Sequence, residues 1–168
     1  PPFKLPNARF VLAYSRARSA SPPISTPPCL TKCLPDSRVV SVRILLDTHV
    51  FIWAVTDSRR LSKDARNAIS EATEVFVSAA SIWEIAIKSA IGKIKADAGE
   101  MTHAIAASGF VELPIATVHA AQVARLPLLK DHKDPFDRLL VAQSIVEPLV
   151  LLTADPKVAA YGGLIRAV

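Results

Sequence analysis

From residue 43 onward, short apolar runs alternate with longer stretches of helical character, and this alternation limits the fold more than any other feature. Strands are predicted near 43–47, 74–78, 110–113 and 149–153, with a weaker one near 163–167. Helices are predicted over 49–56, 62–73, 80–91, 98–108, 117–125 and 136–146. Apolar runs separated by helices are typical of parallel strands buried on both faces. The pattern therefore predicts an α/β fold around a parallel sheet, without internal repeats.

Local signals support several of these boundaries. Ser62 precedes a helical stretch and is a good N-cap residue, because its hydroxyl can accept a hydrogen bond from the first turn. Gly92 and Gly109 stand where two predicted helices should end, since glycine readily adopts the left-handed conformation of a helix terminus.

The composition fits one folded domain but gives little support for a broad nucleic-acid surface. The chain has 168 residues, is 51% apolar and carries a net charge of +5. No apolar run approaches the roughly 20 residues that span a bilayer. Residues 1–41 hold six of the 20 basic residues and one of the 15 acidic residues, which leaves 14 of each in 42–168. Nucleic-acid binding must therefore depend on a local basic patch or on a bound metal.

Residues 1–41 differ in composition from the rest of the chain. They contain eight of the 13 prolines and both cysteines, Cys29 and Cys33. The segment is predicted not to fold by itself. It has some likeness to an organellar transit peptide, although its prolines oppose an amphipathic helix, and it lacks the apolar core of a secretory signal.

A third interpretation of this leader is that it is not native sequence. Our hypothesis is that translation begins at Val42, so that the folded domain is 42–168. A native-host protein whose intact mass includes the leader would contradict it. The Cys29/Cys33 spacing is poor for zinc, and a domain without cysteine fits a reducing cytoplasm.

Four acidic residues stand where an apolar run stops or a helix begins: Asp47, Glu84, Asp137 and Asp155. The carboxyl ends of neighbouring parallel strands lie on one edge of a sheet, where α/β folds place their active sites. Four carboxylates gathered there would repel one another unless a divalent cation neutralised them. The pattern therefore predicts a metal-dependent site.

Each of these carboxylates also has a capping interpretation. Asp134 is a good N-cap before Pro135, and Ser81 with Glu84 matches a capping box. If the helix that contains Glu84 starts earlier, at Ser78, then Glu84 lies in its interior and its buried carboxylate needs a partner. Lys88, four residues further along the helix, could supply that partner. A carboxylate can cap a helix and bind a metal, because it has about four acceptor positions.

From about Val42 onward, the chain resembles the PIN-domain ribonucleases of the VapC toxin type. The matching stretches are LLDTHVFIW (45–53), SAASIWEIAIKSAIGKI (78–94), LPLLKDHKDPFDRLLVAQS (126–144) and LLTAD (151–155). The resemblance implies a three-layer α/β/α fold with a mostly parallel sheet and one acidic pocket. The alternation of strands and helices agrees with it.

The same resemblance implies roles for individual residues. The expected metal ligands and catalytic residues are Asp47, Glu84, Asp137 and Asp155, with Asp134 as a capping residue or an outer-sphere partner. Thr48 and Thr153 could hydrogen-bond the carboxylates or a metal-bound water. Many relatives have Asn where this chain has His49, for which a helix-start or substrate role is expected.

Oxygen ligands without a cysteine or histidine set favour Mg²⁺ or Mn²⁺ over zinc. The expected reaction is hydrolysis of RNA phosphodiester bonds, with a metal-activated water in line with the leaving oxygen. No pair of histidines suited to metal-independent cleavage is evident. The resemblance implies products with a 5′ phosphate and a 3′ hydroxyl.

Residues beyond the acidic set could contact the RNA. Lys133, within the loop 130–133, and Arg138 are candidates, although a solvated loop with local ion pairs is an equal alternative. Trp53 and Trp83 could stack on bases, but core or interface packing is the preferred interpretation of both. The resemblance also implies a small antitoxin encoded beside the toxin, and a homodimer. Exposed apolar surface on the first two helices would suit both contacts.

Two alternatives from other classes stay open. A catalytically silent PIN-like module would bind RNA or protein without cutting, although all four acidic positions are filled. A phospho-acceptor signalling domain also places an Asp after a strand, but it requires paired acids at the first strand and a Lys after the last long one. Here the first strand ends in Asp47-Thr48-His49, and no such Lys follows Leu152.

Overall fold

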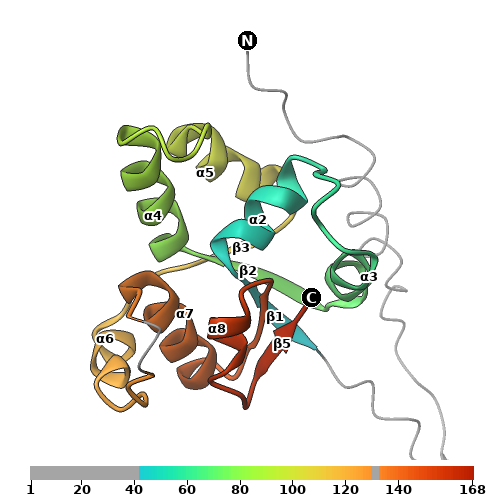
Figure 1. Ribbon diagram of the computed structural model, residues 1–168. Helices are drawn as coiled ribbons and strands as arrows, with labels where there is room; N and C mark the ends of the chain where they lie inside the picture. The colour runs from blue at the N-terminus through green and yellow to red at the C-terminus, as the bar shows by residue number, and fades with distance from the viewer. Residues whose placement is uncertain (1–41, 130–132) are drawn as a thin grey trace, which may run out of the picture.

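A sheet of five parallel strands forms the centre of the domain, as the computed structural model in Figure 1 shows. The structure describes residues 42–129 and 133–168, so the predictions for the leader 1–41 and for loop residues 130–132 lie outside the described residues. The strands are β1 (Arg43–Leu46), β2 (Glu74–Ser78), β3 (Val111–Leu113), β4 (Val150–Thr153) and β5 (Ile165–Ala167).

The strand order is β3-β2-β1-β4-β5, and each neighbouring pair is parallel. The chain runs outward from β1 through β2 to β3 and then returns to the other side of β1 as β4. This reversal creates a topological switch point between β1 and β4. Ligands of open α/β sheets bind in the crevice at the carboxyl ends of strands at such a point.

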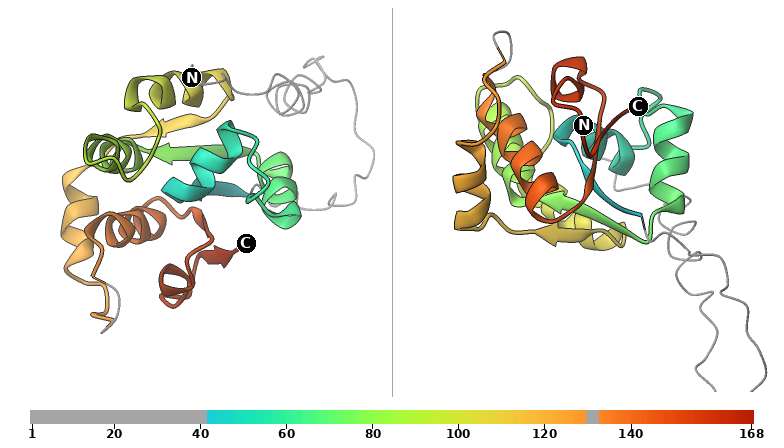
Figure 2. Two further views of the ribbon diagram at one scale, coloured as in Figure 1. Left: turned by 45° about the horizontal axis from the view of Figure 1, so that its top comes forward. Right: turned by 90° about the horizontal axis from the view of Figure 1, so that it is seen from below.

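Seven helices lie within the described residues: α2 (Thr48–Val55), α3 (Lys63–Glu71), α4 (Ala79–Ala90), α5 (Ala98–Ala107), α6 (Thr117–Val123), α7 (Pro135–Val146) and α8 (Pro156–Ala159). Helices α2, α3 and α5 contribute to the core on one face of the sheet, and α7 and α8 to the core on the other. Helix α6 packs against α7, while α4 contacts α2, α5 and α7. Figure 2 shows the sheet between the two sets of helices.

The two core clusters follow the alternation of side chains along each strand. Ile44 and Leu46 of β1 enter one cluster, whereas Leu45 enters the other, and all three are at most 1% exposed. Successive side chains of a strand point to opposite faces, so a continuous apolar run implies burial on both sides. The predicted three-layer α/β/α fold is confirmed, with every described strand parallel.

Several local predictions are confirmed. The hydroxyl of Ser62 accepts a 3.0 Å hydrogen bond from the Ala65 N–H. Gly92 and Gly109 follow α4 and α5 with φ angles of 71° and 72°, in the left-handed region. Helix α8 is absent from the predicted helices, because four residues are too few to show a helical period.

The start of α4 decides between the two interpretations of Glu84. The N-cap is Ser78, whose hydroxyl accepts a hydrogen bond from the Ala80 N–H. Glu84 is therefore an interior helical residue, and the capping box with Ser81 is wrong. None of the helices in the described residues combines the length and apolar character that crossing a bilayer requires.

Candidate active site

The carboxyl ends of β1 and β4 bring Asp47 and Thr153 together. Leu46 pairs with Leu152, and the Asp47 N–H donates a 3.0 Å hydrogen bond to the Leu152 carbonyl. The Thr153 hydroxyl donates a 2.7 Å hydrogen bond to Asp47 Oδ2 and accepts one from the Asp155 N–H at 3.0 Å. Asp47 is 3% exposed and is the N-cap residue of α2, and a backbone hydrogen bond from His49 acts on its carboxyl.

Glu84 is held by a second threonine, Thr48. The Thr48 hydroxyl donates a 2.6 Å hydrogen bond to Glu84 Oε2, and both residues are buried. Glu84 lies on α4, which follows β2, the neighbour of β1 in the sheet. Two threonine hydroxyls thus each hold one buried carboxylate at the carboxyl edge of the sheet.

Burial raises the pKa of the Asp47 carboxyl above its ordinary value. The hydrogen bond from Thr153 and the neighbouring His49 oppose this rise, while the negative charge of Glu84 adds to it. The negative charge of Glu84 thus acts on the Asp47 carboxyl. A cation bound beside the two carboxylates would lower the pKa of Asp47 and so favour its ionised form.

Lys88 is the basic partner of Glu84. It forms an ion pair with Glu84 Oε1 from four residues along α4, as predicted for an interior Glu84. Partial burial lowers the pKa of Lys88, but the hydrogen bond and charge of Glu84, together with Asp134 and Asp137, raise it above its usual value. Asp134 and Asp137 therefore lie close enough to act on the same ammonium group.

Asp134 and Asp137 both stand at the start of α7. Asp134 is the N-cap, and its Oδ1 accepts a 2.9 Å hydrogen bond from the Phe136 N–H. Asp137 is half-buried in the first turn. Asp155 caps α8 by accepting a 2.8 Å hydrogen bond from the Lys157 N–H. The capping interpretation is thus confirmed for Asp134 and Asp155, which leaves their remaining acceptor positions for other partners.

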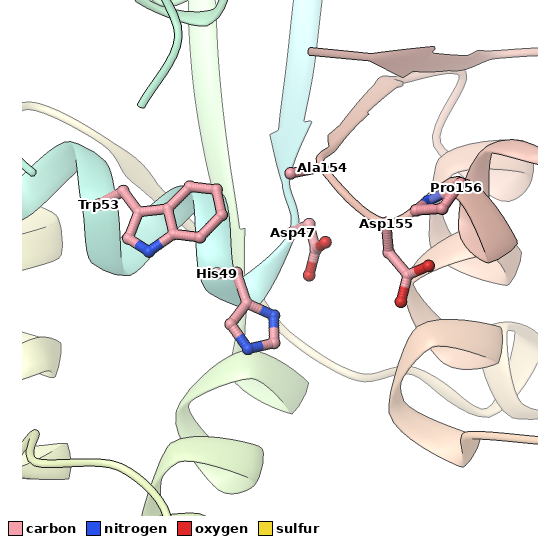
Figure 3. Close-up of a pocket in the computed structure, with 6 residues that line it drawn as sticks. All are labelled: Asp47, His49, Trp53, Ala154, Asp155 and Pro156. Carbon is pink, nitrogen blue, oxygen red and sulfur yellow. The ribbon is translucent and has the colours of Figure 1, made fainter. Parts of the chain in front are cut away.

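A pocket of about 290 Å³ opens beside Asp47. It is lined by the six residues drawn in Figure 3: Asp47, His49, Trp53, Ala154, Asp155 and Pro156. Asp47 and Asp155 share this pocket, whereas Glu84 and Asp137 do not line it. The structure therefore brings two of the four predicted carboxylates to one cavity, while Glu84 pairs with Lys88 and the charge of Asp137 acts on the same ammonium group.

The donors at this site suit a hard cation. Mg²⁺ commonly binds through one or two carboxylates and keeps several waters. Asp47 and Asp155 supply two carboxylates at this pocket. Across residues 42–129 and 133–168, no three His, Cys, Asp or Glu side chains lie close enough together to hold a metal. The pocket thus fits a partly hydrated cation better than a cage made wholly of protein ligands.

Arg138 is engaged in structural contacts. Its guanidinium donates to the carbonyls of Val123 and Pro127, at 3.0 Å each, and to the Tyr161 hydroxyl at 3.1 Å. These bonds tie α7 to the end of α6, to the segment that follows α6, and to Tyr161 after α8. Lys133 is exposed, and its predicted substrate role stays a prediction.

The structure alters the interpretation of the two tryptophans. Trp83 is 55% exposed and forms an edge-to-face contact with Phe136, so it is not a core residue. Trp53 is half-buried: it packs against the core, as expected, and it also lines the pocket, which was not expected. Its spacing of four residues from His49 was the available signal, because residues one turn apart share a helix face.

Taken together, the fold and site define an α/β protein with an acidic crevice at the switch point of a parallel sheet. Residues 44–164 match the PIN domain family, and the chain belongs to it. A solved structure described as "Toxin-antitoxin complex from Klebsiella pneumoniae" is similar, with a TM-score of 0.52 and 20% identity over 74% of this chain and 96% of that one. At this identity the likeness shows the shared fold. No curated protein sequence matches the chain.

Proposed function

We propose that the protein is a Mg²⁺- or Mn²⁺-dependent endoribonuclease and the toxin of a toxin–antitoxin pair. The observation that carries this proposal is the buried carboxylate of Asp47, which interacts with Glu84 and opens with Asp155 onto one pocket. A buried carboxylate with a raised pKa is costly to maintain, and such groups are concentrated at functional sites. PIN domains are generally nucleases.

In this proposal Asp47 and Asp155 bind a partly hydrated metal at the pocket, and the predicted ligands Glu84 and Asp137, with Asp134, act on it through bound water. Bound Mg²⁺ or Mn²⁺ would lower the pKa of a water and stabilise charge on the scissile phosphate. Thr153 orients Asp47, and Thr48 orients Glu84, through their hydrogen bonds. Lys88 balances the negative charge of Glu84 and of the α7 carboxylates nearby.

The proposed protein partner is a small antitoxin, and the similar solved structure is described as a toxin–antitoxin complex. We assign it to a row of exposed apolar side chains on α4 and its C-cap, formed by Trp83, Ile87 and the C-cap residue Ile91, which are 55%, 40% and 60% exposed. They recur every fourth residue and so share one face of the helix. The expected apolar surface on the first two helices is wrong, because the exposed residues of α2 and α3 are polar or charged.

Two finer predictions complete the proposal. A homodimer follows from the family resemblance, and light scattering coupled to gel filtration would measure its mass.

The cytoplasm is the proposed location, because the RNA substrate and the antitoxin are made there.

The decisive experiment measures Mn²⁺-dependent cleavage of RNA by the wild-type protein and by Asp47→Asn. We expect cleavage that EDTA abolishes, fragments with a 5′ phosphate, and at least about a hundredfold loss in the variant, because even residues supporting metal ligands contribute 10–100-fold. Equal cleavage by the variant, or cleavage in EDTA, would contradict the proposal. RNA binding without any cleavage would instead support the catalytically silent module.

A further inference from the structure

We infer that the pocket beside Asp47 receives one unpaired RNA base next to the scissile phosphate, stacked on the indole of Trp53. This inference deepens the proposed nuclease function and rests on it. It assigns Trp53 as the residue that positions one base of the substrate beside the acidic end of the pocket.

The first support is the placement of Trp53. The preceding aromatic residue of α2, Phe51, is fully buried in the core, whereas Trp53 is half-buried and lines the pocket. Part of the Trp53 ring packs against the core, and the part left uncovered lines the pocket. The exposed part of the indole therefore offers an aromatic surface to a ligand.

The second support is the order of groups along the pocket. The His49 and Trp53 rings lie 6.1 Å apart between centroids, at an angle of 44°. His49 and Asp47 line the same pocket. In Figure 3, Asp47 stands with His49 and Trp53 on one side and Asp155 on the other. The pocket thus has an acidic end suited to a cation and phosphate, and an aromatic end suited to a base.

The third support is the size of the cavity. At about 290 Å³ it lies at the lower limit of typical small-molecule sites, which range from about 300 to 1,000 Å³. This volume suits a single nucleotide better than a longer segment. A tilted pair of rings cannot enclose a base between them at a centroid distance of 6.1 Å, so the base stacks on Trp53 while His49 borders its edge.

A base can reach this indole only when it has left its own stack. In an RNA duplex each base is stacked and paired, whereas bases of loops and single strands can be splayed onto aromatic side chains. Aromatic stacking tolerates any base, since every base has a π face. The pocket therefore selects for unpaired structure at the cleavage site more strongly than for sequence.

Fluorescence tests this contact without any need for cleavage. The chain has two tryptophans, so Trp83→Phe leaves Trp53 as the sole indole emitter. In Mg²⁺, nucleoside 5′-monophosphates should quench Trp53 emission saturably, while ribose 5-phosphate should not. The matched variant Trp53→Phe, which retains only Trp83, should show no saturable quenching. Equal effects of nucleotide and ribose 5-phosphate, or no quenching by either, would overturn the inference.

Cleavage of modified RNA gives a second and separate test. An abasic site beside the scissile bond should lower kcat/KM of the wild-type protein by about tenfold to a hundredfold, the range expected for loss of one stacked base. On intact RNA, Trp53→Leu should lower kcat/KM by the same factor. The abasic site should cause no further decrease in this variant. Equal cleavage of intact and abasic RNA would overturn the inference and leave the nuclease proposal standing. If no RNA is cut, the nuclease proposal fails and the fluorescence result still decides the inference.

Discussion

The hydroxyl of Thr153 donates a 2.7 Å hydrogen bond to the carboxylate of Asp47, 106 residues away in the sequence. The same oxygen accepts from the Asp155 N–H, so one threonine connects two of the predicted metal ligands. This arrangement exists because β1 and β4 are neighbours whose carboxyl ends coincide. The predictions below depend on it and on the ion pair between Glu84 and Lys88.

Asp47→Asn should stabilise the protein in EDTA. Burial raises the pKa of Asp47 in the folded state, so the folded protein binds more protons than the unfolded chain between the two pKa values. Stability therefore rises as pH falls through the folded pKa, and at neutral pH the ionised carboxylate is unfavourable. Removing this charge should therefore raise Tm at neutral pH.

Thermal melts at several pH values would measure this effect. The gain in Tm of Asp47→Asn over wild type should shrink as pH falls through the folded pKa of Asp47, because the wild-type carboxyl is then protonated. A gain that grows toward low pH would contradict the assigned direction. In the same variant the cleavage of RNA should be lost.

Thr153→Val should weaken metal binding while Thr153→Ser should not. Valine matches threonine in shape but removes the hydroxyl that orients Asp47 and accepts from the Asp155 N–H. We expect Mn²⁺ affinity to fall by about 10–100-fold, as for other groups that support metal ligands. Calorimetric titration with Mn²⁺ measures this, and equal affinities of the two variants would exclude the hydroxyl as the cause.

Lys88→Met should have opposite effects on stability and on metal affinity. In EDTA it leaves the buried charge of Glu84 without its cation, which should cost about 2 kcal/mol, less than a fully buried pair because the Lys88 side chain is 26% exposed. Mn²⁺ affinity should rise by about tenfold, since a competing positive charge is gone. The exposed Lys93, changed to Met, is the control and should alter neither quantity. A variant that binds Mn²⁺ more weakly would contradict this role of Lys88.

Arg138→Gln should lower stability without changing RNA binding. The guanidinium ties α7 to two carbonyls and to Tyr161, so its loss should cost about 1–3 kcal/mol in denaturant unfolding. The dependence of RNA affinity on salt should be unchanged, because a residue that contacts phosphate reduces that slope by about one when it is removed. A reduced slope would instead support the predicted substrate contact.

Replacing Ile87 and Ile91 by Ser should weaken antitoxin binding by about tenfold or more, because apolar residues at the centre of an interface carry much of its free energy. Both are exposed, so Tm should change little. Ile145→Ser, on α7 and 45% exposed, is the matched control. Unchanged affinity in the double variant, measured with the protein encoded beside this one, would place the interface elsewhere.

The sequence by itself determined the strands, most helices and the positions of the acidic residues along them. These follow from local chemistry: apolar runs form strands buried on two faces, Ser62 and Asp134 cap helices, and Lys88 reaches Glu84 across one helical turn.

The partners of each carboxylate were decided only by the tertiary structure. Thr153 meets Asp47, and Thr48 meets Glu84, because strands distant in sequence became neighbours. Exposure was decided in the same way. Trp53 opens onto a pocket, and the apolar row lies on α4 instead of the first two helices. Whether a side chain is buried depends on which helices and strands, distant in the sequence, pack over it. The local amino-acid pattern does not specify that packing.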